Sequence, residues 1–219
     1  AFYEQALGIA DTTSVAIADI DGDGRNDIAT TSGSTVIVLL QGPEPASPGS
    51  FTAGNAYPAG RGSADVAVGD LNGDSLPDLA VANRGDAGGG SVSIHYQDPA
   101  GAGTFLAGPR YQTDENTQRI KIMDLNNDGL PDLAAANNDH EGGSVSVLLQ
   151  NDMIRGEFYA PDNYPGLSGP DDVAAVDVNG DGFADLVIAD KCRDSGERPY
   201  IRQQDDASPG NFLSPVYLP

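Results

Sequence analysis

Four repeats of about 50 residues, each with four short strand-like segments, predict an all-β fold built of β-propeller blades of four antiparallel strands. Acidic nine-residue segments begin at residues 19, 70, 124 and 177, so the unit recurs at intervals of 51, 54 and 53 residues. No segment has a convincing helical period over about 11 residues. Gly (28) and Pro (15) are frequent, as in chains of short strands joined by turns. A solenoid fits less well because its repeats are usually shorter or helical, and a β-sandwich does not predict a strict repeat.

Each unit contains the same four strands in the same order. The first strand precedes the acidic segment, in SVAIADI, ADVAVGDL, QRIKIMDL and DDVAAVDV, and the second follows it, in DIAT, DLAVAN, DLAAAN and DLVIAD. The third is predicted in STVIVLLQ, GSVSIHYQ, GSVSVLLQ and the weaker RPYIRQQD. A Gly-rich turn leads to the fourth, in SFTAGNAYP, TFLAGPRYQ, EFYAPDNYP and NFLSPVYLP. Apolar alternation bounded by turn residues is typical of strands.

These units predict one partial propeller domain over residues 1–219. Its expected parts are an outer strand of a preceding or closing blade at 1–10 and blades at 11–59, 60–113, 114–166 and 167–219. Seven blades at this spacing would need about 350 residues. We therefore expect part of a larger propeller, an unusual closure of four blades, or copies that assemble into a ring. Unpaired blade edges would otherwise be exposed and prone to self-association.

The acidic segments DIDGDGRND, DLNGDSLPD, DLNNDGLPD and DVNGDGFAD share the spacing D-x-[DN]-x-D-[GS]-x-x-D. Positions one, three, five and nine offer side-chain oxygens, and position seven can offer its backbone carbonyl. Ca²⁺ takes about six to eight oxygen ligands, whereas Mg²⁺ prefers fewer protein ligands and more water. Gly at positions four and six permits the positive φ of a tight turn. The spacing therefore predicts up to four Ca²⁺ ions, one per blade.

The expected ligands are Asp19, Asp21, Asp23, the Arg25 carbonyl and Asp27 in the first loop; Asp70, Asn72, Asp74, the Leu76 carbonyl and Asp78 in the second; Asp124, Asn126, Asp128, the Leu130 carbonyl and Asp132 in the third; and Asp177, Asn179, Asp181, the Phe183 carbonyl and Asp185 in the fourth.

The loops have two other possible interpretations. An EF-hand requires Glu at position 12 and flanking helices, but position 12 is Thr30, Val81, Ala135 or Ile188 and the flanks are strands. Metal-free polar turns are the alternative, because Asp, Asn and Gly favour turns. Four such loops in phase favour the metal. The second loop departs most from the pattern, since Ser75 replaces Gly at position six.

The D-x-[DN]-G-D-G-x-x-D loops between V-A-x-x-D and D-L-A-x-A strands resemble the FG-GAP/VCBS repeats, which form the propeller of integrin α subunits and of many bacterial secreted proteins. The resemblance covers essentially the whole chain. It implies Ca²⁺ in the loop between the first and second strand of each blade, and propellers that are commonly seven-bladed. Such proteins mostly mediate adhesion or recognition; some are lectins, and some are appended to secreted enzymes.

The charge balance limits the possible partners. With 33 acids against 11 bases the formal net charge is −22, which repels nucleic acid and anionic membranes. No apolar run of about 18 residues is present, so we expect no membrane span. Cys192 is the only cysteine, which is compatible with an oxidising compartment. An extracellular, cell-surface or periplasmic location is therefore expected.

No G-x-S-x-G, H-E-x-x-H or P-loop motif is present, so we expect no enzyme. The sequence favours a calcium-stabilised recognition module for protein–protein or cell-surface adhesion. The alternative is a carbohydrate-binding lectin or the accessory propeller of a secreted hydrolase, although Trp is absent. A protein or glycan ligand is expected on the face opposite the calcium loops, which carries the loops 84–90, 138–143, 191–198, 59–63, 113–117 and 166–171.

Overall fold

The computed structural model describes residues 8–42, 50–86, 89–138, 142–191, 198–214 and 216–217. Their strands form four antiparallel sheets, each made of four consecutive strands. The strands are β1 (Thr12–Ala18), β2 (Asp27–Ser32), β3 (Thr35–Gln41), β4 (Phe51–Pro58), β5 (Ser63–Gly69), β6 (Asp78–Asp86), β7 (Gly89–Gln97), β8 (Phe105–Gln112), β9 (Thr117–Met123), β10 (Asp132–Asn137), β11 (Gly143–Leu148), β12 (Asp162–Leu167), β13 (Pro170–Val176), β14 (Asp185–Asp190), β15 (Arg198–Arg202) and β16 (Val216–Tyr217).

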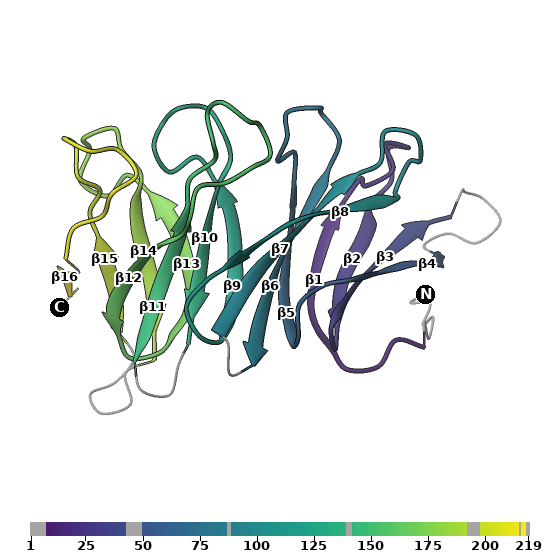
Figure 1. Ribbon diagram of the computed structural model, residues 1–219, viewed down its shortest axis with the longest axis horizontal. Helices are drawn as coiled ribbons and strands as arrows, with labels where there is room; N and C mark the ends of the chain where they lie inside the picture. The colour runs from purple at the N-terminus through teal and green to yellow at the C-terminus, as the bar shows by residue number, and fades with distance from the viewer. Residues whose placement is uncertain are drawn as a thin grey trace, which may run out of the picture.

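The expected all-β architecture of four-stranded blades is confirmed. The sheets follow one another across the molecule in chain order, with β1–β4 at one end and β13–β16 at the other (Figure 1). The described residues of these four blades do not close a ring by themselves. β12 extends to Leu167, one residue into the unit expected for the fourth blade, because Leu167 is buried and pairs with Gly143. Of the outer strand expected at 1–10, residues 1–7 lie outside the described residues and residues 8–10 are not in a strand.

The second strand of an inner blade is buried on both faces, and β10 shows why. Every residue of β10 is buried. Ala135 packs into the core between the second and third sheets, and its neighbour Ala134 packs into the core between the third and fourth sheets. Because successive side chains of a strand point to opposite faces, both faces of this strand meet another sheet. This position between two sheets accounts for the uninterrupted apolar run LAAA at residues 133–136.

The hydrophobic core is divided into three clusters, one at each junction between successive sheets. Ile20, Val38 and Leu79 belong to the first, Leu71, Ile94 and Leu133 to the second, and Leu125, Val147 and Ile188 to the third. The first strands β1, β5, β9 and β13 contact one another in succession along one side of the row.

An aromatic pair crosses each of the three junctions. Edge-to-face contacts join Tyr57 to Phe105, Tyr111 to Phe158 and Tyr164 to Phe212, with ring centroids 5.4, 5.7 and 5.5 Å apart. Two of the tyrosines also accept a backbone hydrogen bond from their partner, Tyr57 from the Phe105 N–H at 3.2 Å and Tyr111 from the Phe158 N–H at 2.8 Å. The fourth strand of one blade is thereby fixed to the next blade.

The two groups of loops lie on opposite faces, as antiparallel strands require. On one face, backbone hydrogen bonds join the loop after each second strand to the linker that enters the blade: Arg84 N–H to the Gly62 carbonyl, Asn138 N–H to Asn116, and Lys191 N–H to Gly169, each at 3.1 Å. The acidic loops lie at the other ends of the strands. Among the described residues, no helix is long and apolar enough to cross a bilayer.

Candidate metal centre

Each acidic loop connects the first and second strands of its blade, and all four have the same backbone turn. Positions four and six have positive φ in every loop: Gly22 and Gly24, Gly73 and Ser75, Asn127 and Gly129, and Gly180 and Gly182. Ser75 and Asn127 adopt this conformation, at φ 68° and 60°, without being glycine. The replacement of Gly by Ser75 therefore leaves the second loop with the fold of the other three.

The position-nine aspartates are completely buried and hold the loop closed. One oxygen of each accepts the backbone N–H of position two, and the other accepts the N–H of a glutamine at or just beyond the end of the third strand. In the third blade, Asp132 Oδ2 accepts from Leu125 N–H at 2.9 Å and Oδ1 from Gln150 N–H at 2.7 Å. The equivalent carboxylates are Asp27, Asp78 and Asp185, and their glutamine partners are Gln41, Gln97 and Gln204. Position nine is thus a structural anchor within the loop.

The position-one aspartates place a carboxylate oxygen inside each loop. Oδ2 of Asp19, Asp70, Asp124 and Asp177 accepts the N–H of position six at 2.9 Å in all four loops. The other oxygens of Asp19 and Asp124 are buried and have no hydrogen-bond partner in the described part of the chain. An unpartnered buried carboxylate oxygen is costly, because its hydration is lost without replacement.

Position five is exposed in every loop, whereas position three is half-buried in the first three loops and exposed in the fourth. Where position three is Asn, its amide donates to the position-five carboxylate, from Asn72 to Asp74 at 3.1 Å, from Asn126 to Asp128 at 2.9 Å and from Asn179 to Asp181 at 2.6 Å. The first loop has Asp21 at position three instead, and its position-five Asp23 forms an ion pair with Arg25.

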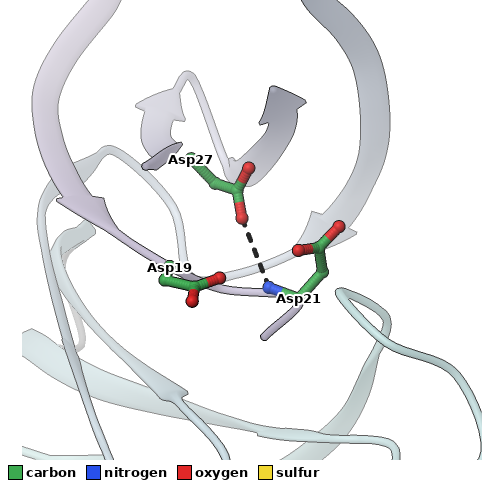
Figure 2. Close-up of side chains that lie close together, drawn as sticks. All are labelled: Asp19, Asp21 and Asp27. Carbon is green, nitrogen blue, oxygen red and sulfur yellow. Dashed lines mark hydrogen bonds between the residues drawn. The ribbon is translucent and has the colours of Figure 1, made fainter. Parts of the chain in front are cut away.

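The first loop brings three carboxylates together. Oxygens of Asp19, Asp21 and Asp27 all lie within 4.8 Å of one another (Figure 2). The Asp21 N–H also donates to Asp27 Oδ2 at 3.2 Å. Burial raises the pKa of Asp21, and repulsion from Asp27, Asp23 and Asp19 raises it further. Asp23 is outside this group, because its carboxylate turns to the Arg25 guanidinium.

Burial also perturbs the position-nine carboxylates of the second and third loops. It raises the pKa of Asp78 to about 6 and that of Asp132 to about 6, and the carboxylates at positions five and one add to the rise. The backbone N–H donors oppose it. At the exposed fourth loop, the N–H groups of Gly182 and Gly180 lower the pKa of Asp177. The loops thus hold negative charge at a cost that a cation would offset.

The donor set fits Ca²⁺. In the first loop, oxygens of three carboxylates converge, and no other three acidic residues of the described chain come as close together. In all four loops, the position-seven carbonyls of Arg25, Leu76, Leu130 and Phe183 accept no loop or side-chain hydrogen bond among the described residues. The unpartnered oxygens of Asp19 and Asp124 would gain a partner from a bound cation. Side chains of positions one, three and five would hold the ion together with the position-seven carbonyl and position nine.

The glutamines that contact position nine were not among the predicted site residues. A signal for them was present, since Gln41, Gln97, Gln150 and Gln204 recur at the same place in the four units. Their spacing of 14 to 19 residues from the position-nine aspartates hid the contact.

Comparison with known proteins agrees with the repeat. A model of the FG-GAP-like repeat matches residues 19–81, 70–135 and 124–188. A T-cell immunomodulatory protein homolog of Plasmodium yoelii yoelii is 38% identical over 80 residues, covering 31% of this chain and 11% of that protein. A solved structure of an Agrocybe aegerita lectin, described as specifically recognising non-reducing terminal N-acetylglucosamine, aligns with a TM-score of 0.51 and 20% identity, covering 92% of this chain and 50% of the lectin chain. The chain therefore spans half or less of the length of either protein.

Proposed function

Because the chain belongs to the FG-GAP-like repeat family, we propose that it is a calcium-stabilised β-propeller recognition module of a secreted or surface-exposed protein. It acts by binding a protein or cell-surface partner and contributes no catalytic step of its own. The relative named as a T-cell immunomodulatory protein homolog supports a role in recognition at cell surfaces.

One observation carries the calcium part of the proposal. The same oxygen-rich turn recurs in four blades, and in two of them a position-one oxygen is buried without a hydrogen-bond partner among the described residues. A metal-free polar turn would leave this oxygen exposed to water or pair it with a donor. A cation in the loop explains its burial and the crowding of carboxylates around it.

The partner binds on the face opposite the calcium loops. Side chains of the second strands fix the backbone of the loops on this face. Asn83 Oδ1 accepts the Gly60 N–H at 2.8 Å, and Asp190 accepts the N–H groups of Ser168 and Gly169 at 2.9 and 2.6 Å. Loops held rigidly on a β scaffold bind a partner at a low entropic cost.

Thermal unfolding in EDTA and in excess Ca²⁺ tests the metal assignment. Each site at a free calcium concentration of 100 times its Kd stabilises the fold by about 2.7 kcal/mol, which raises the Tm of a chain of this size by roughly 5–10 °C. Calorimetric titration then counts the sites, with up to four expected. A melting curve that does not change between EDTA and calcium would remove the basis of the proposal.

A carbohydrate ligand is the second candidate, favoured by the structural similarity to the N-acetylglucosamine-specific lectin. A glycan array probed in calcium and again in EDTA separates the two. Calcium-dependent binding to defined sugars favours the lectin, whereas an array without binding favours a protein partner.

A further inference from the structure

A glutamine side chain bridges the acidic loops of neighbouring blades. Gln97, Gln150 and Gln204 are buried, and the Nε2 of each donates to two backbone carbonyls. One carbonyl lies in the same blade, just before position nine: Pro77 at 3.0 Å, Pro131 at 2.9 Å or Ala184 at 3.0 Å. The other is position two of the preceding blade's acidic loop: Ile20 at 2.8 Å from Gln97, Leu71 at 2.9 Å from Gln150, and Leu125 from Gln204.

Position two lies between the ligands at positions one and three, so the bridge fixes the backbone from which both ligand side chains project. A second contact supports the same segment. In the loop after the third strand of the following blade, a glycine with positive φ lies against position three of the preceding acidic loop. A Cβ on Gly156 would stand 3.1 Å from Asn72 Cβ, one on Gly103 3.4 Å from Asp21 Cβ, and one on Gly210 3.5 Å from Asn126 Cβ.

The fourth loop provides a comparison within the same chain. Ile20, Leu71 and Leu125, at position two of the first three loops, are 0% exposed, whereas Val178 in the fourth is 43% exposed. Among the described residues, no glutamine donates to the Val178 carbonyl, and the side chain of Gln41 in the first blade donates to no carbonyl. Each of the first three loops is therefore completed by the blade that follows it.

We propose that Gln97, Gln150 and Gln204 are positioning residues that couple calcium binding in one blade to the docking of the next. The proposal rests on the calcium-binding function proposed above. Because such coupling is reciprocal, a docked blade strengthens calcium binding in the loop before it, and calcium strengthens the junction.

Calorimetric calcium titration of Gln150→Leu tests the coupling, with Gln41→Leu as the matched control. Gln150→Leu removes the bridge to Leu71 but keeps the backbone N–H that anchors Asp132. We expect it to weaken one site at least about fivefold, the lower end of typical coupling, while Gln41→Leu leaves all affinities unchanged. Equal affinities in the two variants would overturn the coupling, whereas a wild-type chain that binds no calcium would overturn the proposed function instead.

A double-mutant cycle identifies the affected loop. In a chain whose second loop is disabled by Asp70→Asn and Asp74→Asn, Gln150→Leu should cause no further loss of calcium affinity. A loss that persists would place the effect of Gln150 in its own third loop and refute the bridge. Gln97→Leu makes the same test at the first loop, through Ile20, and serves if Gln150→Leu does not fold.

Discussion

Replacing Asp132 by alanine separates the structural role of position nine from its role as a metal ligand. Asp132 is completely buried and accepts hydrogen bonds from the N–H groups of Leu125 and Gln150. The substitution leaves both buried donors without a partner, at about 1–3 kcal/mol each. In EDTA, the free energy of unfolding should therefore fall by about 2–6 kcal/mol, which lowers the Tm by roughly 4–24 °C.

Asp128→Ala is the matched control in the same loop. Asp128 is exposed, and its hydrogen-bond partners Asn126 and Leu130 are half-buried, so that water can reach the donors that the substitution frees. In EDTA this variant should stay within about 0.5 kcal/mol of the wild type, although it should lose part of the stabilisation by calcium. Urea unfolding in EDTA measures the difference. If Asp132→Ala and Asp128→Ala unfold at the same urea concentration as the wild type, the anchoring role of position nine is wrong.

Two further predictions concern pH and the blade junctions. Since the folded pKa of Asp78 and Asp132 is about 6, above the ordinary 3.8, the folded state binds more protons than the unfolded state; in EDTA, stability should fall as the pH rises from about 4 through 6. Excess calcium should remove this decline. Urea unfolding across the same pH range measures it, and a free energy of unfolding that falls equally with pH in calcium and in EDTA would contradict the assignment of these aspartates to a metal site. Tyr111→Phe leaves the Phe158 N–H without its acceptor and should lower the free energy of unfolding by about 1–3 kcal/mol. The control Tyr159→Phe changes an exposed ring and should change that free energy by less than about 0.5 kcal/mol. Equal melting temperatures for the two variants would show that the Tyr111 hydroxyl does not hold the junction.

The sequence alone determined the features that depend on short spacing. Alternation of apolar residues located the strands, and the period of the acidic segments predicted one acidic loop between the first and second strands of each blade. Positions four and six were expected to need positive φ, and all four loops have it, Ser75 included. These features follow from a few neighbouring residues, whose turn geometry is set locally.

Only the tertiary structure decided how the loops are completed. Nothing in the spacing indicated that Asp23 turns to Arg25, or that position nine is anchored by a glutamine at or just beyond the end of the third strand. The bridges from Gln97 to Ile20 and from Gln150 to Leu71 join residues 77 and 79 apart in the chain. Such contacts depend on how one sheet stacks on the next, because a buried amide finds its acceptor only after the two blades have packed together.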